Sequence, residues 1–278
     1  MDSKYAKDPL GMRMKSSYED RTRYYLPRRT YTIVRLDGCH FHTYTRGLNK
    51  PFDKGLSDDI DASIIAMLPE MQGAVFAYTQ SDEISVLLTD FATPKTDAWF
   101  DGNLQKMCSV ASSVMTAEFN QVRLERAFKT AQGLPIDLNS ANFIKHLAYF
   151  DARVFTIPDR IEVMNYFIWR NQDCSRNSVS MVAQSNFSHK ELQGKNTPQM
   201  HEMLHQKGVN WATDYSDGDK NGRLIVKETY TIASGSVPDV PNFKVVPGVV
   251  ERTRWVSQGA WKFTENKEKL LAMIPKYE

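Results

Sequence analysis

The chain has 278 residues, of which 41% are hydrophobic, 11% aromatic and 24% charged, and its formal net charge is +2. This length allows a large core in one domain or two small ones, while no apolar run approaches the ~20 residues that span a bilayer. The polar start has no signal-peptide core, and three widely spaced cysteines (Cys39, Cys108 and Cys174) fit neither a disulfide framework nor a cysteine zinc site, so we expect a reducing, cytoplasmic setting.

The first 35 residues are basic, with nine Lys and Arg against four Asp and Glu. An excess of this kind is typical of a surface that faces a polyanion such as RNA. A solvated basic face would have the same composition, so both interpretations stay open.

The first predicted strand and helix lie between residues 30 and 69. TYTIVRLD (30–37) is rich in β-branched residues and closes on an Asp-Gly turn signal, so it predicts a strand. SDDIDASIIAMLP (57–69) has apolar residues at helical spacing, which predicts a helix with Ser57 as its N-cap.

Two strands, a long helix and a fourth strand are predicted next. AVFAYTQ (74–80) and ISVLLT (84–89) predict strands that are joined by the tight turn Ser-Asp-Glu. Residues 98–119 have the spacing of a long amphipathic helix, and LAYFDARVFTIP (147–158) predicts a strand.

The order β-α-β-β-α-β is that of the split βαβ arrangement, an α+β fold with an antiparallel sheet flanked by helices. A right-handed crossover makes the first two strands parallel, and the third lies between them in the opposite direction. The end of the first strand and the tip of the hairpin then meet at one edge of the sheet. Asp37 and Asp82 are therefore predicted to be neighbours.

The rest of the chain, residues 159–278, is predicted to be helical first and β-like at the end. RIEVMNYFIWRNQDCSRNSVSMVAQ (160–184) predicts a helix, FSHKEL contains a capping box, and a short helix is expected between Thr197 and Gly208. GRLIVKETYTI (222–232) and VVERTRWVSQG (249–259) predict strands on either side of a Pro/Gly-rich connection at 234–248.

Two carboxylates that converge at ~4 Å repel by ~4 kcal/mol at an effective dielectric constant of ~20. The fold must therefore raise a pKa, supply a cation or bind a metal. Carboxylate oxygens suit Mg²⁺, which fills its other positions with water and phosphate oxygens. Gly38 would allow close approach of the backbone, and the turn amides of residues 38–42 could cradle a triphosphate. An Asp-Gly pair is also a common plain turn, so spacing alone does not decide.

Several motifs together resemble those of the tRNA-histidine guanylyltransferase family. They are RLDGCHFH (35–42), KPFD (50–53), QSDEIS (80–85), FDARV (150–154) and YFIWRNQDC (166–174). The resemblance implies a polymerase-like palm at residues 1–158 and a C-terminal region, 159–278, that completes the nucleotide- and tRNA-binding surface. It also implies two Mg²⁺ ions, with ATP and GTP or other nucleoside triphosphates as substrates.

The family motifs also imply roles for individual residues of this chain. Asp37, Asp82 and Glu83 would be catalytic, and Asp37, Asp82 and the carbonyl of Gly38 would ligate the metals. The implied nucleotide contacts come from the motifs and from the long helix: Asp37, Gly38, Cys39, His40, Phe41, His42, Lys50, Ser81, Asp82 and Lys106. Candidate tRNA contacts are polar residues of the basic N-terminus and of the region around WRNQDC: Arg13, Lys15, Arg28, Arg29, Arg170, Arg176, Asn177 and Lys195.

The implied reaction has two nucleotidyl-transfer steps. ATP first adenylylates the 5′-monophosphate of the RNA, and the 3′-hydroxyl of an incoming nucleotide then attacks that end and expels AMP, so growth runs in the 3′-to-5′ direction. Cys39, His40 and Asn103 depart from the family pattern and remove positive charge that could hold phosphate.

Two further features separate the branches of the family. The stretch DCSRNSVS has Ser175 where the eukaryotic enzymes have a histidine, and LGMRMKSSYE is similar to the start of the bacterial and archaeal branch. We therefore expect repair of 5′-truncated tRNA, with addition of a single G to tRNA-histidine as the alternative. The family resemblance also implies a homotetramer.

Three rival functions remain open. HEMLHQKGVNW (201–211) matches the H-E-x-x-H zinc motif, but Trp211 stands where the third ligand is needed. A nucleotide cyclase would use the same two aspartates, without a need for the basic N-terminus or the WRNQDC helix. A non-catalytic RNA-binding module would stack bases on sheet aromatics, whereas the acidic motifs found here would repel phosphate without a metal.

Overall fold

A six-stranded sheet with strand order β4-β1-β3-β2-β5-β6 forms the centre of the computed structural model, which describes residues 8–130, 147–233 and 249–277. All neighbouring strands are antiparallel. The strands are β1 Tyr31–Gly38, β2 Ala74–Gln80, β3 Glu83–Thr89, β4 Phe150–Ile157, β5 Arg223–Ala233 and β6 Val249–Gly259.

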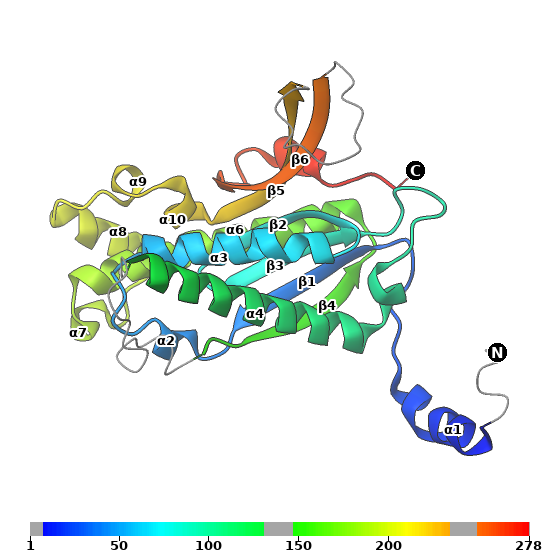
Figure 1. Ribbon diagram of the computed structural model, residues 1–278. Coiled ribbons are helices and arrows are strands. Elements are labelled where there is room, and N and C mark those ends of the chain that lie inside the picture. The colour runs from blue at the N-terminus through cyan, green and yellow to red at the C-terminus, as the bar shows by residue number, and fades with distance from the viewer. Residues whose placement is uncertain (1–7, 131–146, 234–248, 278) are drawn as a thin grey trace.

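Helices cover both faces of this sheet. The helices are α1 Pro9–Met14, α2 Phe41–Tyr44, α3 Lys54–Met67, α4 Leu104–Thr130, α6 Arg160–Asn186, α7 His189–Leu192, α8 Thr197–Gln206, α9 Trp211–Asp214, α10 Asp217–Asn221 and α11 Lys267–Met273. Short turns of other helix types are η2 Lys15–Glu19, η3 Asp20–Thr22, η4 Leu68–Glu70 and η5 Trp99–Gly102. Figure 1 shows α3 and α4 across one face and α6 behind the other. Within the described ranges no helix is long and apolar enough to cross a membrane.

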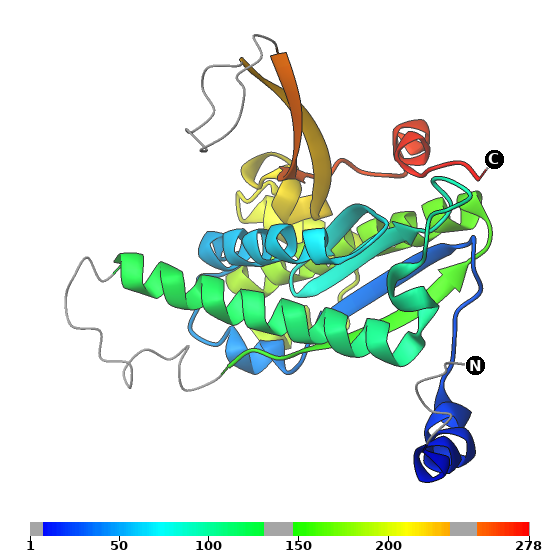
Figure 2. The same cartoon turned by 45° about the vertical axis from the view of Figure 1, so that its right-hand side comes forward.

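The predicted α+β arrangement is confirmed, because β3 lies between β1 and β2 and β4 flanks β1. The two C-terminal strands extend this same sheet, since Ala77 of β2 pairs with Ile225 of β5. Beyond that contact β5 and β6 continue as a two-stranded ribbon that projects from the body (Figure 2). The C-terminal region is thus joined to the N-terminal region through one continuous sheet.

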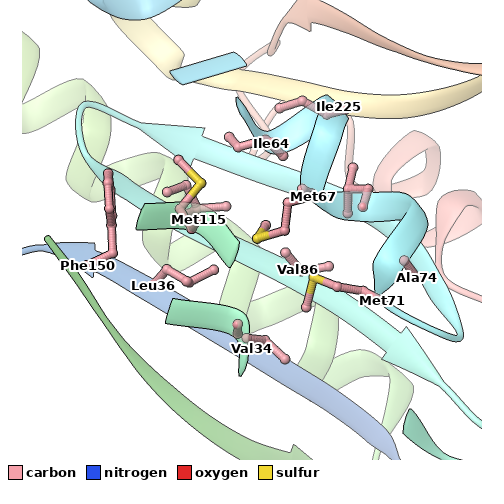
Figure 3. Close-up of a cluster of buried hydrophobic side chains, with 14 of the residues drawn as sticks. Val34, Leu36, Ile64, Met67, Met71, Ala74, Val86, Met115, Phe150 and Ile225 are labelled. Atoms are coloured by element: carbon pink, nitrogen blue, oxygen red, sulfur yellow. The ribbon is translucent and has the colours of Figure 1, made fainter. Parts of the chain in front are cut away.

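Alternation along the strands decides which side of the sheet each residue faces. Val34 and Leu36 of β1 are fully buried beneath α3 and α4, whereas Ile33 is buried on the α6 face. Figure 3 shows Val34, Leu36 and Met115 within one cluster of buried side chains. A slip of one residue would drive Arg35 and Asp37 into the apolar α3/α4 core, so burial on both faces fixes the register. This register places Asp37 on the α6 face.

The helix α3 begins earlier than predicted. Asp53, and not Ser57, is its N-cap, because the Asp53 carboxylate accepts hydrogen bonds from the amides of Leu56 (2.8 Å) and Asn49 (3.1 Å). Ser57 consequently lies inside the first turn, facing a cavity. Aspartate and serine are comparable N-caps, and here the two amide contacts of Asp53 fix the start of the helix.

The helix α4 is offset from the predicted range of 98–119. Phe100 and Asp101, inside η5, have left-handed backbone conformations (φ of 50° and 53°), so the predicted continuous helix is interrupted before α4 begins. Asn103 then caps the new helix by accepting a hydrogen bond from the amide of Lys106 at 3.0 Å. At its other end α4 runs on to Thr130, and Arg123 bonds to the buried Asp59 of α3 at 2.7 Å.

The C-terminal helices start where their capping residues predict. Ser188 and Glu191 form the expected capping box of α7. α8 begins at Thr197 as predicted, after a second capping box formed by Asn196 and Gln199. The connection at 234–248 lies outside the described residues.

Candidate active site

Asp37 and Asp82 lie together where β1 ends against the β2–β3 hairpin. Leu36 pairs with Ile84 across β1 and β3, so the next residues of β1 run alongside the hairpin tip. A Cβ atom placed on Gly38 would lie only 2.7 Å from Oδ2 of Asp82. Both aspartates line one cavity of about 550 Å³. The predicted topology made Asp37 and Asp82 neighbours, and the structure agrees.

The electrostatics of the pair favour a bound cation. Burial raises the pKa of Asp82 to about 6, and the negative charges of Asp37 and Glu83 add to this rise, while a hydrogen bond from Ser81 opposes it. The pKa of Asp37 is also raised, chiefly by burial and then by Glu83, with Arg35 acting in the opposite direction. At neutral pH both carboxylates are charged, although burial disfavours the charged form. A divalent cation would stabilise them.

The donor set fits a hard cation such as Mg²⁺. Carboxylate oxygens and a backbone carbonyl are the ligands that Mg²⁺ takes, together with water and phosphate oxygens. Within the described residues no three His, Cys, Asp or Glu side chains gather as a metal cluster. A cation here would therefore rely on Asp37, Asp82, backbone and substrate oxygens.

Glu83, predicted to be catalytic, has no lone pair left for a metal or a substrate. Its Oε1 accepts hydrogen bonds from Nε of Arg170 (2.6 Å) and Nε2 of Gln80 (3.1 Å). Its Oε2 accepts from Nη2 of Arg170 (2.7 Å) and Nη2 of Arg35 (2.5 Å). These four bonds use the four acceptor positions of a carboxylate. The contacts argue against a direct catalytic role.

Arg170, predicted to contact tRNA, is unavailable to RNA. Its side chain is buried, with the residue only 4% exposed. Besides the two bonds to Glu83, it donates to Asp173 at 2.8 Å and lies 4.3 Å from the centre of the Trp169 ring. The tRNA prediction for Arg170 is wrong because this residue lies on the inner face of α6.

Most predicted nucleotide contacts surround the aspartates. His42, Lys50 and Ser81 line the 550 Å³ cavity. An adjoining cavity of about 410 Å³ is lined by Gly38, His40, Phe41, His42, Thr45, Ser81 and Asp82. The side chain of Phe41 is mostly packed in the core against Tyr44, Phe119 and Phe150, so its backbone is the part best placed for a phosphate.

Cys39 is poorly placed for the predicted nucleotide contact. Its amide donates to the carbonyl of Tyr149 at 2.8 Å, and its Sγ lies 3.8 Å from Oδ2 of Asp151. The amide is therefore already used, and the thiol is directed toward β4. Cys39, which departs from the family pattern, therefore adds no group that is placed to bind phosphate.

Lys106, also predicted to contact nucleotide, lies at the opposite end of the sheet. The neighbouring Leu104 donates its amide to the carbonyl of Tyr24, in the segment that leads into β1. From Tyr31 at the start of β1 to Asp37 near its end is ~20 Å at the rise of a strand. Figure 1 shows the start of α4 far from α2. Lys106 therefore does not line either cavity of its own chain, and its nucleotide contact stays a prediction.

Arg28 and Arg29 of the basic N-terminal segment bond within the chain. Nε of Arg28 donates to Asp90 at 2.7 Å and Nη2 of Arg29 donates to the carbonyl of Pro94 at 2.8 Å. These bonds anchor the approach to β1. Arg13 is exposed on α1, and Lys15 lies in η2, whereas residues 1–7 lie outside the described ranges.

Besides Arg170, three predicted tRNA contacts belong to the C-terminal region. Arg176 is 64% exposed, although it is paired with Asp173. Asn177 lines the main cavity and Lys195 is exposed. These three side chains remain placed for contact with a large ligand.

A comparison with protein families decides the identity of the chain. Residues 11–158, more than half of the chain, match the family described as tRNAHis guanylyltransferase. The chain belongs to the tRNA-histidine guanylyltransferase family. It is therefore a member of a family of nucleotidyltransferases, as the motifs predicted.

Two individual relatives match most of the length of this guanylyltransferase family member. An uncharacterized protein of Acanthamoeba polyphaga mimivirus is 30% identical over 213 residues, which covers 72% of the chain and 70% of the relative. The tRNA(His) guanylyltransferase of Schizosaccharomyces pombe is 26% identical over 212 residues, or 72% and 74% of the two chains.

Solved structures of bacterial relatives match over nearly the whole length. A bacterial tRNA(His) guanylyltransferase-like protein in complex with ATP has a TM-score of 0.78 and 38% identity, covering 96% of this chain and 99% of that one. A structure in complex with GTP has a TM-score of 0.73, 36% identity and the same coverage.

The H-E-x-x-H segment of this guanylyltransferase family member has no zinc ligand set. His201 and His205 lie on α8, and the ring of His201 packs edge-on against Trp211 at 5.3 Å between ring centroids. In the described part of the chain no third His, Cys, Asp or Glu joins them. α8 instead buries Leu204 against α6, as a surface helix does.

Sequence reasoning missed several residues of the cavity. Gln80, Asp173 and Arg223 line it, and Oε1 of Gln80 is buried without a hydrogen-bond partner among the described residues. Gln80 belongs to the QSDEIS motif, so it could have been found from the sequence. Arg223 comes from β5, and no sequence signal connects it to the aspartates.

Proposed function

We propose that this protein adds nucleotides to the 5′ end of tRNA in the 3′-to-5′ direction, as a Mg²⁺-dependent nucleotidyltransferase that repairs 5′-truncated tRNAs. The observation that carries the proposal is the pair of half-buried aspartates, Asp37 and Asp82, which line one cavity of about 550 Å³. Cavities of this size are typical of small-molecule sites.

We assign the metal positions to Asp37, Asp82 and the carbonyl of Gly38. Two Mg²⁺ ions bound there would supply charge neutralisation and activate an attacking hydroxyl. The absence of a side chain at Gly38 leaves the space that a Cβ atom would take from Asp82, so carbonyl and carboxylate stay close together.

The nucleotide would lie along the same cavity. The bacterial relatives were solved with ATP and with GTP, which supports both as substrates here. Lys50, Ser81 and His42 are placed to contact the triphosphate. The apolar wall that remains for a base is formed by Leu48, Phe52, Leu56, Ile60 and Met181.

The RNA would bind across the two parts of the chain. We propose that residues 1–158 act as the catalytic palm and that residues 159–278 complete the binding surface, through Arg176, Asn177 and Lys195. The shared sheet and the α6 wall of the cavity support this division of labour. By family resemblance we further propose a cytoplasmic homotetramer.

The repair role is favoured over addition of one G to tRNA-histidine. Ser175 replaces the histidine of the eukaryotic enzymes, and its hydroxyl donates to the carbonyl of Asn171 (3.2 Å) and faces Oδ1 of Asn221 at 3.1 Å. The Ser175 hydroxyl is thus used in contacts within the protein, which supports the repair role.

The substrate test is incubation with ATP, labelled GTP, Mg²⁺ and one of two tRNAs. A 5′-monophosphorylated tRNA lacking its first nucleotide is expected to be extended at least about tenfold faster than intact tRNA-histidine, a difference of ~1.4 kcal/mol in the barrier. Faster extension of tRNA-histidine would assign the protein to single-G addition. RNA-independent formation of a cyclic nucleotide would make it a cyclase.

A further inference from the structure

A buried ion-pair node lies directly behind the two aspartates. It consists of Glu83, Arg35 and Arg170, defined by the four hydrogen bonds to the Glu83 carboxylate. Arg35 precedes Asp37 by two residues on β1, and alternation puts both on the α6 face of the sheet. Glu83 immediately follows Asp82. One carboxylate therefore links the backbone segments that carry both aspartates.

Arg170 is itself held from several sides. It joins Glu83 through two parallel bonds of 2.6 and 2.7 Å, the geometry in which a guanidinium constrains orientation as well as distance. Its Nη2 also donates to Asp173, which is further bonded by Arg176 and, at 3.4 Å, by Asn177. Trp169 lies over its guanidinium. The node is thus attached to two turns of α6.

Opposite charges are paired throughout this assembly. Arg35 and Arg170 oppose Glu83, and Arg170 and Arg176 oppose Asp173, so each of these carboxylates has two guanidinium partners. Loss of Arg170 would leave Glu83 with only Arg35 and Gln80, and would place a further partly uncompensated carboxylate beside Asp82. Repulsion would then drive the hairpin tip away from β1.

We propose that Glu83 and Arg170 are positioning residues that set the separation of Asp37 and Asp82 for metal binding. The proposal rests on the proposed function, because it requires Asp37 and Asp82 to hold the cations. Glu83 and Arg170 line the main cavity, but their side chains are bonded to each other and to neighbouring residues, so we assign neither of them a direct metal contact. Both act indirectly, because Glu83 of β3 connects β1 and β3 to α6 through its bonds to Arg35 and Arg170.

A second buried node in the same protein provides a matched control. Asp59, with 0% exposure, bonds to Arg123 at 2.7 Å and to Arg126 at 2.5 Å, and so joins α3 to α4. Neither cavity at the aspartates is lined by Asp59, Arg123 or Arg126. Arg123→Gln therefore damages a comparable carboxylate–arginine contact without changing the site.

The experiment titrates Mn²⁺ into the full-length protein and measures free Mn²⁺ by electron paramagnetic resonance. Urea unfolding and kcat and KM for ATP in the adenylylation of tRNA are measured in parallel. Arg170→Gln is expected to weaken Mn²⁺ binding at least about tenfold, the usual effect of losing a partner behind the ligands. Its kcat is expected to fall with KM for ATP nearly unchanged. Arg123→Gln is expected to lose stability while binding Mn²⁺ like the wild type.

Two further variants keep the result interpretable if Arg170→Gln folds poorly. Arg170→Lys keeps the charge but not the two parallel bonds, so its Mn²⁺ affinity is expected to lie between those of the wild type and Arg170→Gln. Glu83→Gln combined with Arg170→Gln is expected to lose less affinity than the two single losses together, since the two residues act on one contact.

The outcomes separate the two proposals. Wild-type Mn²⁺ affinity in Arg170→Gln and Arg170→Lys, or an equal loss in Arg123→Gln, would overturn the positioning role and leave the metal assignment intact. A wild-type protein that binds no Mn²⁺ would instead overturn the proposed function itself.

Discussion

Replacing Asp82 with asparagine is expected to lower the rate of nucleotide addition by about 10³-fold or more, because one of the two carboxylates that would hold the cations is lost. The same change is expected to stabilise the metal-free protein. Burial raises the pKa of Asp82 from 3.8 to about 6, so the charged carboxylate destabilises the fold at neutral pH by up to ~3 kcal/mol.

The sign of this effect gives a pH dependence. Because the pKa in the folded protein lies above the unfolded value, the carboxylate's penalty is complete above about pH 6 and fades as the pH falls toward 3.8. The stability advantage of Asp82→Asn should therefore be present at pH 7.5 and vanish by pH 4. Melting temperatures across this range, with and without Mg²⁺, measure it.

The control for this prediction is Asp151→Asn. Asp151 faces Asp37 across β1 and β4 and is 51% exposed, so its loss changes nearby charge without removing a proposed ligand. Mg²⁺ should raise the melting temperature of the wild type and of Asp151→Asn, but not that of Asp82→Asn. An active Asp82→Asn, or one that is less stable than the wild type at pH 7.5, would contradict the metal assignment.

Replacing Gly38 with alanine is expected to be nearly as damaging. The new Cβ would lie 2.2 Å from Cδ2 of Phe41 and 2.7 Å from Oδ2 of Asp82, distances that force movement. Phe41 cannot retreat easily, because its ring is packed against Phe119 and Phe150. We expect a loss of ~1–3 kcal/mol in the free energy of unfolding from overpacking, and a fall in activity of about 10²-fold or more from displacement of Asp82.

Gly47→Ala separates the steric effect from a general effect of losing a glycine. Gly47 has a φ of 93°, and no atom lies within 4 Å of the position that a Cβ would take, so alanine there costs only the ~1 kcal/mol of an unfavourable backbone. Urea unfolding and the rate of adenylylation, measured on both variants, test the difference. If Gly47→Ala lost as much activity as Gly38→Ala, the close approach at Gly38 would not be the cause.

The part of the site that follows from topology could be predicted from the sequence. Asp37 ends a predicted strand and Asp82 lies in the tight turn of a predicted hairpin, and the split βαβ order leaves little choice about where the strand end and the turn meet. The helix ends were less certain, since Asp53 and Ser57 are both good capping residues and only the tertiary structure shows which one is used.

The charged residues whose surroundings differ from the sequence-based expectation have partners that lie elsewhere in the fold. Arg170 and Glu83 both occur in polar motifs, and nothing in either motif shows that they are bonded to each other across 87 residues. Lys106 lies at the far end of a helix whose direction relative to the cavity depends on how it packs. In each case the missing information is a long-range contact, which periodicity and local spacing do not contain.

The central claim is that Asp37 and Asp82 together hold divalent cations beneath a nucleotide's phosphates. Its most direct test is a crystal structure with Mn²⁺ and a non-hydrolysable ATP analogue, using anomalous scattering to locate the metal. We predict manganese peaks in contact with carboxylate oxygens of both aspartates and with the triphosphate. Manganese and triphosphate bound at another place, with both aspartates free of metal, would contradict the claim.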